Sequence, residues 1–230
     1  MNNIDKSWKG FYKISGISSI TGAAFFIAGL VMNFIIAIPP DSTTAEQLEI
    51  LAKNSTLFQL GNIAVLLSDV FSALAILGIY FSLHMLKKGV ALTGSALYIL
   101  GASLAVMLHI LEQGHVYIAG NFLQAIDEIH QFQYITAFEL LKSITTNGYF
   151  IANLLIGAGF LTIGIAMLSG VYNRKTAWLV IFTSIVFITG CFAIIFTWVP
   201  AFILLAACFL SLICSTWIGL RLIAIDLEIT

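Results

Sequence analysis

The stretch NIAVLLSDVFSALAILGIYF, residues 62–81, combines the two features on which the interpretation of the whole chain depends. It is long and apolar enough to cross the roughly 30 Å hydrocarbon core of a bilayer, yet Asp69 stands near its middle. A carboxylate at that depth costs on the order of 2.5–3.5 kcal/mol on membrane-insertion scales. We therefore predict that Asp69 turns toward the interior of a helical bundle, where it is protonated or paired with hydrogen-bond donors.

The composition of the chain indicates that lipid is its solvent and its first partner. Of the 230 residues, 60% are hydrophobic and only 9% are charged. Soluble domains carry roughly 25% charged residues, so this chain could not cover a surface that faces water. The net charge of −1 predicts no nucleic-acid partner.

Six apolar segments are each long enough for a transmembrane helix of about 20 residues. The predicted spans are 14–38, 57–86, 90–112, 143–169, 176–198 and 201–223, with outer loops at 39–56 and 113–142. We place a turn at Pro200, because one helix through the last two spans would be about 70 Å long. The predicted fold class is all-α, a single membrane domain over residues 1–230 built as a bundle of six transmembrane helices.

Lysine and arginine fall unequally on the two sides of this predicted topology. Eight of the ten lie on the side of the N-terminus, namely Lys6, Lys9, Lys13, Lys87, Lys88, Arg174, Lys175 and Arg221. The other two are Lys53 and Lys142. Because cytoplasmic loops carry the excess of basic residues, we predict a multi-pass protein of the cell membrane with both termini in the cytoplasm.

Two predicted outer segments have helical character. The stretch PPDSTTAEQLEILAKN, residues 39–54, begins with prolines and capping residues and predicts a short amphipathic helix. Residues 116–135 place apolar side chains at helical spacing among polar ones. They predict either a helix lying on the outer membrane surface or an extension of the third span.

The first candidate site surrounds Asp69. Ser72 lies on the same helical face, and Asn153 lies at a similar depth in the fourth predicted span. One hypothesis is a proton or cation relay, or a polar contact for a ligand. The alternative is a hydrogen-bonded residue that holds neighbouring helices together.

The second candidate site lies at the outer end of the third predicted span. His109, Glu112 and His115 follow one another at three-residue spacing, which places them as neighbours on a helix. Imidazole and carboxylate groups are possible zinc ligands, so these residues are also the candidates for a metal site, completed from another span. An outer ligand-binding or pH-sensing cluster and ordinary interfacial polarity are the other two interpretations.

Two stretches resemble the DUF4386 family of bacterial and archaeal membrane proteins. Residues 42–92 carry the resemblance at Phe58, Asp69, Ala73, Ala75, Tyr80, Lys87 and Ala91, and residues 149–190 carry it at Ser169, Gly170 and Arg174. The family usually has proline in the turn that follows Ser169 and Gly170, where this chain has Lys175 and Thr176 after Arg174. The resemblance implies a six-span helical protein of uncharacterised function and transfers no catalytic residue.

Three functions are compatible with the sequence. The leading hypothesis is a non-enzymatic protein that binds or moves a small solute, proton or lipid through a polar centre near Asp69. The second is a membrane-embedded, metal-dependent enzyme that acts on lipid through His109, Glu112 and His115. The third is a structural or assembly subunit. The sequence specifies neither a cofactor nor the small-molecule ligand, and it leaves a homo-oligomer open.

Overall fold

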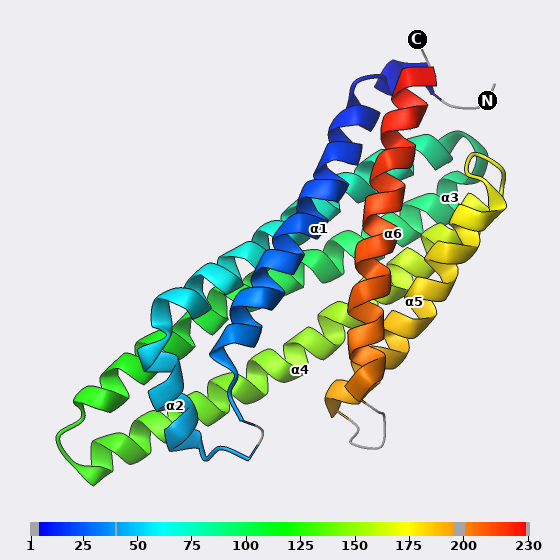
Figure 1. The fold of residues 1–230 in the computed structure, drawn as a ribbon. Coiled ribbons are helices and arrows are strands. Elements are labelled where there is room, and N and C mark those ends of the chain that lie inside the picture. The colour runs from blue at the N-terminus through cyan, green and yellow to red at the C-terminus, as the bar shows by residue number, and fades with distance from the viewer. Residues whose placement is uncertain (1–4, 40, 196–200, 229–230) are drawn as a thin grey trace.

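The structure, a computed structural model, describes residues 5–39, 41–195 and 201–228 (Figure 1). Within these residues every regular element is helical, which confirms the predicted all-α class. A short 3₁₀ turn, η1 (Lys6–Trp8), precedes the first helix. The α-helices are α1 (Phe11–Ile36), α2 (Thr44–Lys53), α3 (Ser55–Gln124), α4 (Glu128–Met167), α5 (Arg174–Ile195) and α6 (Ala201–Glu228).

Five helices among the described residues are long and apolar enough to cross a membrane: α1, α3, α4, α5 and α6. The sequence predicted six spans, and the difference lies in α3. This helix of 70 residues is interrupted at Lys87, whose φ of −139° and ψ of 50° are not helical. The chain turns back there, so that a first arm (55–86) and a second arm (88–124) run side by side (Figure 1).

The segment predicted as an outer loop, 113–142, is helical apart from a short turn at 125–127. α3 continues to Gln124, and α4 begins at Glu128, with the Asp127 side chain accepting a hydrogen bond from the His130 backbone N–H. The helix that contains the third predicted span is therefore extended, and residues 116–135 do not form a separate helix. Polarity marks the point at which a chain leaves lipid, whereas a helix continues as long as its backbone hydrogen bonds do.

Other helix ends differ from their predicted positions by a few residues. α1 ends at Ile36, where Ala37 adopts a left-handed conformation, rather than at residue 38. α6 continues to Glu228 rather than stopping at residue 223. The predicted turn at Pro200 and the last residues of the fifth predicted span, 196–198, lie outside the described residues.

The short helix α2 lies at one end of the bundle (Figure 1). The capping residues at its start predicted that this helix forms. Thr43 and Glu46 form a reciprocal capping box, and the hydrogen bonds from Thr43 hold the pKa of the Glu46 carboxyl below its usual range. Thr44 Oγ1 donates to Glu139 Oε1 on α4 at 2.8 Å. Lys142 Nζ, also on α4, donates to Gln47 Oε1 at 2.9 Å. These contacts fix α2 against the hairpin of α3 and α4.

Glycine allows two helix pairs to approach at backbone distance. Where α1 crosses α6, a Cβ on Gly219 would lie 2.7 Å from the carbonyl oxygen of Gly16. Where the second arm of α3 crosses α4, a Cβ on Gly159 would lie 2.6 Å from the carbonyl oxygen of Gly94. Small residues at such crossings allow van der Waals packing between helices in lipid. The α3–α4 crossing also brings the polar side chains of the two helices together.

The start of α1 and the end of α6 lie at the same end of the bundle, together with the turn within α3 and the turn after α4 (Figure 1). The Asp226 carboxylate of α6, which is buried, accepts a hydrogen bond from the Gly10 backbone N–H and joins the end of α6 to the start of α1. α2 and the 125–127 turn lie at the opposite end (Figure 1). Most of the lysine and arginine residues therefore gather at one end.

Candidate functional site

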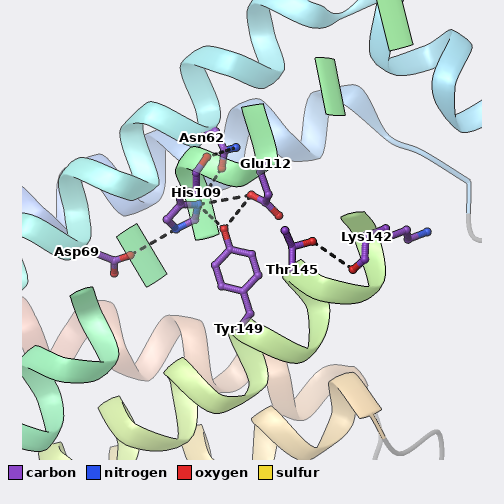
Figure 2. Close-up of polar contacts among 7 residues, drawn as sticks. All are labelled: Asn62, Asp69, His109, Glu112, Lys142, Thr145 and Tyr149. Atoms are coloured by element: carbon purple, nitrogen blue, oxygen red, sulfur yellow. Dashed lines mark hydrogen bonds and ion pairs between the residues drawn. The ribbon is translucent and has the colours of Figure 1, made fainter. Parts of the chain in front are cut away.

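Asp69 faces the interior of the bundle and contacts His109. The distance from Asp69 Oδ2 to His109 Nε2 is 3.4 Å, and the two side chains are only 21% and 10% exposed (Figure 2). Asp69 comes from the first arm of α3 and His109 from the second arm. The pair therefore exists because α3 folds back on itself at Lys87.

The other ring nitrogen of His109 has two close partners. Nδ1 lies 2.9 Å from Asn62 Oδ1 and 2.7 Å from the Tyr149 hydroxyl. Asn62 Nδ2 also donates to the His109 backbone carbonyl at 3.4 Å. A carbonyl oxygen only accepts, so the NH₂ group of Asn62 must face it and Oδ1 must face the ring. Because Oδ1 also only accepts, Nδ1 of His109 carries a hydrogen.

With this assignment, His109 and Asp69 are placed so that they can share one further proton. With Nδ1 protonated, the Nε2 lone pair of a neutral imidazole faces the carboxylate oxygen. Either Nε2 holds the proton and the pair is imidazolium with carboxylate, or Asp69 holds it and both groups are neutral. The net charge of the pair is zero in both cases. The site is thus a two-position holder for one proton.

Tyr149 connects this pair to a second carboxylate. Its hydroxyl donates to Glu112 Oε2 at 2.9 Å, and Glu112 Oε2 also lies 3.5 Å from His109 Nδ1 (Figure 2). Asp69, His109, Tyr149 and Glu112 therefore form a continuous series of contacts, which we call the polar chain. Glu112 lies one helical turn beyond His109 toward the 125–127 turn, so the polar chain runs from the middle of the bundle toward that end.

A cavity of about 280 Å³ opens beside the polar chain, between α1, α3, α4, α5 and α6. Asp69, His109 and Tyr149 lie on its wall, together with Ser72 and Asn153. In the described part of the chain, the Asn153 side chain makes no hydrogen bond and Asp69 Oδ1 has no partner. Both are therefore free to contact a molecule in the cavity.

The two candidate sites predicted from the sequence are one site. Asp69, Ser72 and Asn153 share the cavity wall with His109, and Glu112 follows through Tyr149. The sequence suggested that His109 belongs to an outer polar cluster at the end of the third span. Instead, His109 is buried against the first arm of α3. Helix register alone could not reveal this, because it depends on how the two arms align.

His115 does not join the polar chain. It is buried with its ring centroid 4.9 Å from that of Phe138, and its Nε2 has no hydrogen-bond partner. Among the described residues, no three His, Cys, Asp or Glu side chains are placed to hold a metal ion. The metal hypothesis for His109, Glu112 and His115 therefore has no geometric support, since both ring nitrogens of His109 already face protein oxygens.

Two members of the site were not predicted from the sequence. Asn62 lies seven residues before Asp69, which places it two turns away on the same helical face. Tyr149 lies four residues before Asn153, again on one face. Both are polar side chains in apolar runs, and spacing from the residues already singled out was the signal that could have found them.

No family model matches the sequence, and no curated protein or solved structure is similar to it in direct comparison. The DUF4386 resemblance accordingly stays a prediction. The class of the molecule follows from its own features: its long apolar helices indicate a helical, multi-pass membrane protein. Within that class, it is a protein with a polar chain on the wall of an internal cavity.

Proposed function

We propose that this protein is a proton-linked carrier, which binds a small molecule in the central cavity and couples binding to proton movement along the polar chain. The observation that supports this most directly is the contact between Asp69 and His109, two groups that can share a proton, on the cavity wall. The contacts continue from there to Glu112.

The polar chain has the geometry for proton transfer. The proton on His109 Nδ1 can pass to the Tyr149 oxygen, 2.7 Å away, while the proton of Tyr149 passes to Glu112, 2.9 Å away. Proton transfer requires donor and acceptor within hydrogen-bond reach, and both steps satisfy this. After the two transfers Tyr149 is again neutral, and the proton has moved from the cavity wall to Glu112.

Coupling between ligand and proton follows from the same contacts. A molecule that interacts with the Asp69 carboxylate competes with His109 for it, and so changes how firmly the pair holds its proton. By linkage, protonation of the pair changes the affinity for that molecule by the same factor. The cavity volume of about 280 Å³ favours a small organic molecule over a two-chain phospholipid.

Tyr149→Phe tests the proton route, because it removes only the hydroxyl between His109 and Glu112. The assay mixes the protein in lipid nanodiscs with a probe and follows pH with a dye in stopped flow. The probes are 4-fluorobenzylamine, 4-fluorobenzyl alcohol and 4-fluorobenzoate, which have matched shapes and different charges. We expect at least one probe to release or take up about one proton, and Tyr149→Phe to slow that step at least tenfold.

The matched control is Tyr117→Phe, which makes the same change on α3 at a side chain that is 73% exposed. It is expected to leave the proton step unchanged. Proton transfer in Tyr149→Phe at the rate of the unmodified protein would contradict the route. A protein that responds to none of the three probes would contradict the carrier function.

The proposal includes a topology of six crossings in the cell membrane, with both termini in the cytoplasm. Residues 55–86 and 88–124 each exceed the roughly 20 residues that one crossing requires, so the two arms of α3 would cross separately. The concentration of basic residues at the end that holds both termini supports the orientation.

Cysteine labelling tests this topology. Lys88→Cys lies next to the break in α3, and Glu128→Cys lies at the start of α4. With a membrane-impermeant thiol reagent on intact cells, we expect Glu128→Cys to react and Lys88→Cys to react only after the membrane is opened. The unmodified protein, with its three native cysteines, gives the background. Labelling of both positions from the outside would refute six crossings.

A further inference from the structure

The charge on the cavity wall specifies what the cavity can hold. Among the lining residues, the only Asp, Glu, His, Lys or Arg side chains are Asp69 and His109, so no lysine or arginine lies there. Glu112 adds a second carboxylate behind Tyr149. Even with His109 as imidazolium, two carboxylates and one cation leave a net charge of −1. An anion would be repelled, and a cation would be attracted.

The free oxygen of Asp69 provides a specific contact for a cation. Oδ2 faces His109, whereas Oδ1 has no partner among the described residues and is not sealed from the cavity. Asn153 adds an amide oxygen without a partner. An ammonium group has three N–H donors and no acceptor, so acceptors without partners are the groups it requires.

The rest of the wall suits an apolar body next to the charge. Phe26, Tyr98, Phe160 and Phe187 face the cavity, and the rings of Tyr98 and Phe160 lie 6.0 Å apart between centroids. Aromatic faces attract cations through their quadrupole and bury apolar groups. The polar groups gather around Asp69, so the wall has one polar region and a larger aromatic and aliphatic one.

We infer that the ligand is a small organic amine, bound as its ammonium ion to Asp69 with its apolar part against the aromatic residues, in exchange for one proton. This inference rests on the proposed carrier function and names its substrate class. The ammonium takes over the charge that His109 provided to Asp69. The His109 Nδ1 proton passes to the Tyr149 oxygen as the Tyr149 proton passes to Glu112, which releases it to solvent. One positive charge enters and one leaves, and His109 remains neutral with its hydrogen on Nε2. Nδ1 then accepts a hydrogen bond from the Tyr149 hydroxyl, and the Asn62 amide must turn its NH₂ group toward the ring, because Oδ1 cannot face a bare Nδ1.

Six polar residues face the Asp69–His109 pair from the two arms of α3 and from α4. Asn62 and Ser72 face it from the first arm of α3, and Tyr98 and Glu112 face it from the second arm. Tyr149 and Asn153 face it from α4. None of these is a cation, so nothing else in the described surroundings can replace His109 as the partner of Asp69. If each bound ammonium is matched by one released proton, Asp69 has a cationic partner both with and without the ligand.

The three matched fluorinated probes test the charge preference directly. Their ¹⁹F signals are titrated against the protein in zwitterionic nanodiscs at neutral pH, with empty nanodiscs as the reference for partition into lipid. We expect saturable binding of 4-fluorobenzylamine at least tenfold tighter than that of the alcohol, and no binding of the benzoate. Binding of the amine should release about one proton, measured from the heat of binding in two buffers with different ionisation enthalpies.

Variants assign the preference to Asp69. Asp69→Asn is expected to lower the affinity for the amine at least tenfold and to leave that for the alcohol unchanged. Asp127→Asn, the same change at an exposed position on the 125–127 turn, is expected to keep the preference. The ranking of probes by the unmodified protein needs no variant, so the inference remains testable if Asp69→Asn does not fold.

The outcomes separate this inference from the carrier function. Saturable binding in which the alcohol or the benzoate equals or exceeds the amine would refute the amine as ligand while supporting the cavity as a binding site. Amine binding without proton release would refute the exchange. The absence of saturable binding for all three probes would overturn the carrier function itself.

Discussion

His109→Leu is expected to lower the free energy of unfolding by about 3–5 kcal/mol, because it removes the partner of a largely buried carboxylate. Asp69, Asn62 and Tyr149 each contact the ring of His109, and the leucine side chain replaces none of those contacts. An uncompensated polar group that is already removed from water costs far more than the net value of the pair it belonged to. Unfolding by a denaturing detergent in bicelles, followed by circular dichroism, measures the effect.

The chain provides a matched control for this substitution. His130 also pairs with an aspartate, at 2.8 Å from Asp127, but these two side chains are 60% and 51% exposed. We expect His130→Leu to leave the free energy of unfolding nearly unchanged, because water replaces the lost contact. Equal effects at the two histidines would mean that the Asp69–His109 pair is not buried in the folded protein.

A double-mutant cycle identifies the source of the effect. Asp69→Leu combined with His109→Leu removes both members of the pair, so no carboxylate is left without a partner. The double variant should lose less stability than the sum of the two single variants, with a coupling energy of about 1 kcal/mol or more. Additive effects would show that His109 stabilises the fold through Asn62 and Tyr149 alone.

The helices could be predicted from the sequence, and their ends could not. Apolar runs of about 20 residues are a physical requirement for crossing lipid, so the helices appeared where those runs lie. The second arm of α3 continues past residue 112 because its backbone hydrogen bonds persist where the side chains become polar. The same signal that marked the end of a predicted span therefore said nothing about the end of the helix.

The site shows a similar division. Asp69 and His109 each stand out as ionisable side chains in apolar surroundings, and both belong to the site. Their contact could not be predicted because it depends on the angle at Lys87 and on how the two arms align side by side. Asn62 and Tyr149 carry no charge at neutral pH, and a single amide or phenol can also serve helix packing or lie at the membrane interface. Only the meeting of three helical faces gives these residues a common role.

Gly159→Ala tests the contact that sets this alignment. A Cβ at Gly159 would lie 2.5 Å from the backbone nitrogen of Tyr98 and 2.6 Å from the carbonyl oxygen of Gly94, both on the second arm of α3. Backbone atoms in a helix cannot move aside as a flexible side chain can, so the two helices must separate. Overpacking of this kind costs about 1–3 kcal/mol, and we expect Gly159→Ala to destabilise the fold by at least that amount.

Gly120→Ala makes the same chemical change and is expected to have the opposite effect on stability. Gly120 lies within α3 as Gly159 lies within α4, but a Cβ at Gly120 would meet no atom within 4 Å. Alanine favours the helix over glycine by about 1 kcal/mol, so this variant should be slightly more stable than the unmodified protein. A stabilising effect of Gly159→Ala would show that the two helices do not approach at backbone distance.

The separation of the two helices that Gly159→Ala forces also moves Tyr98 on the cavity wall and draws Tyr149 away from His109. Gly159→Ala should then weaken amine binding and slow proton release in the fraction that still folds, whereas Gly120→Ala should change neither.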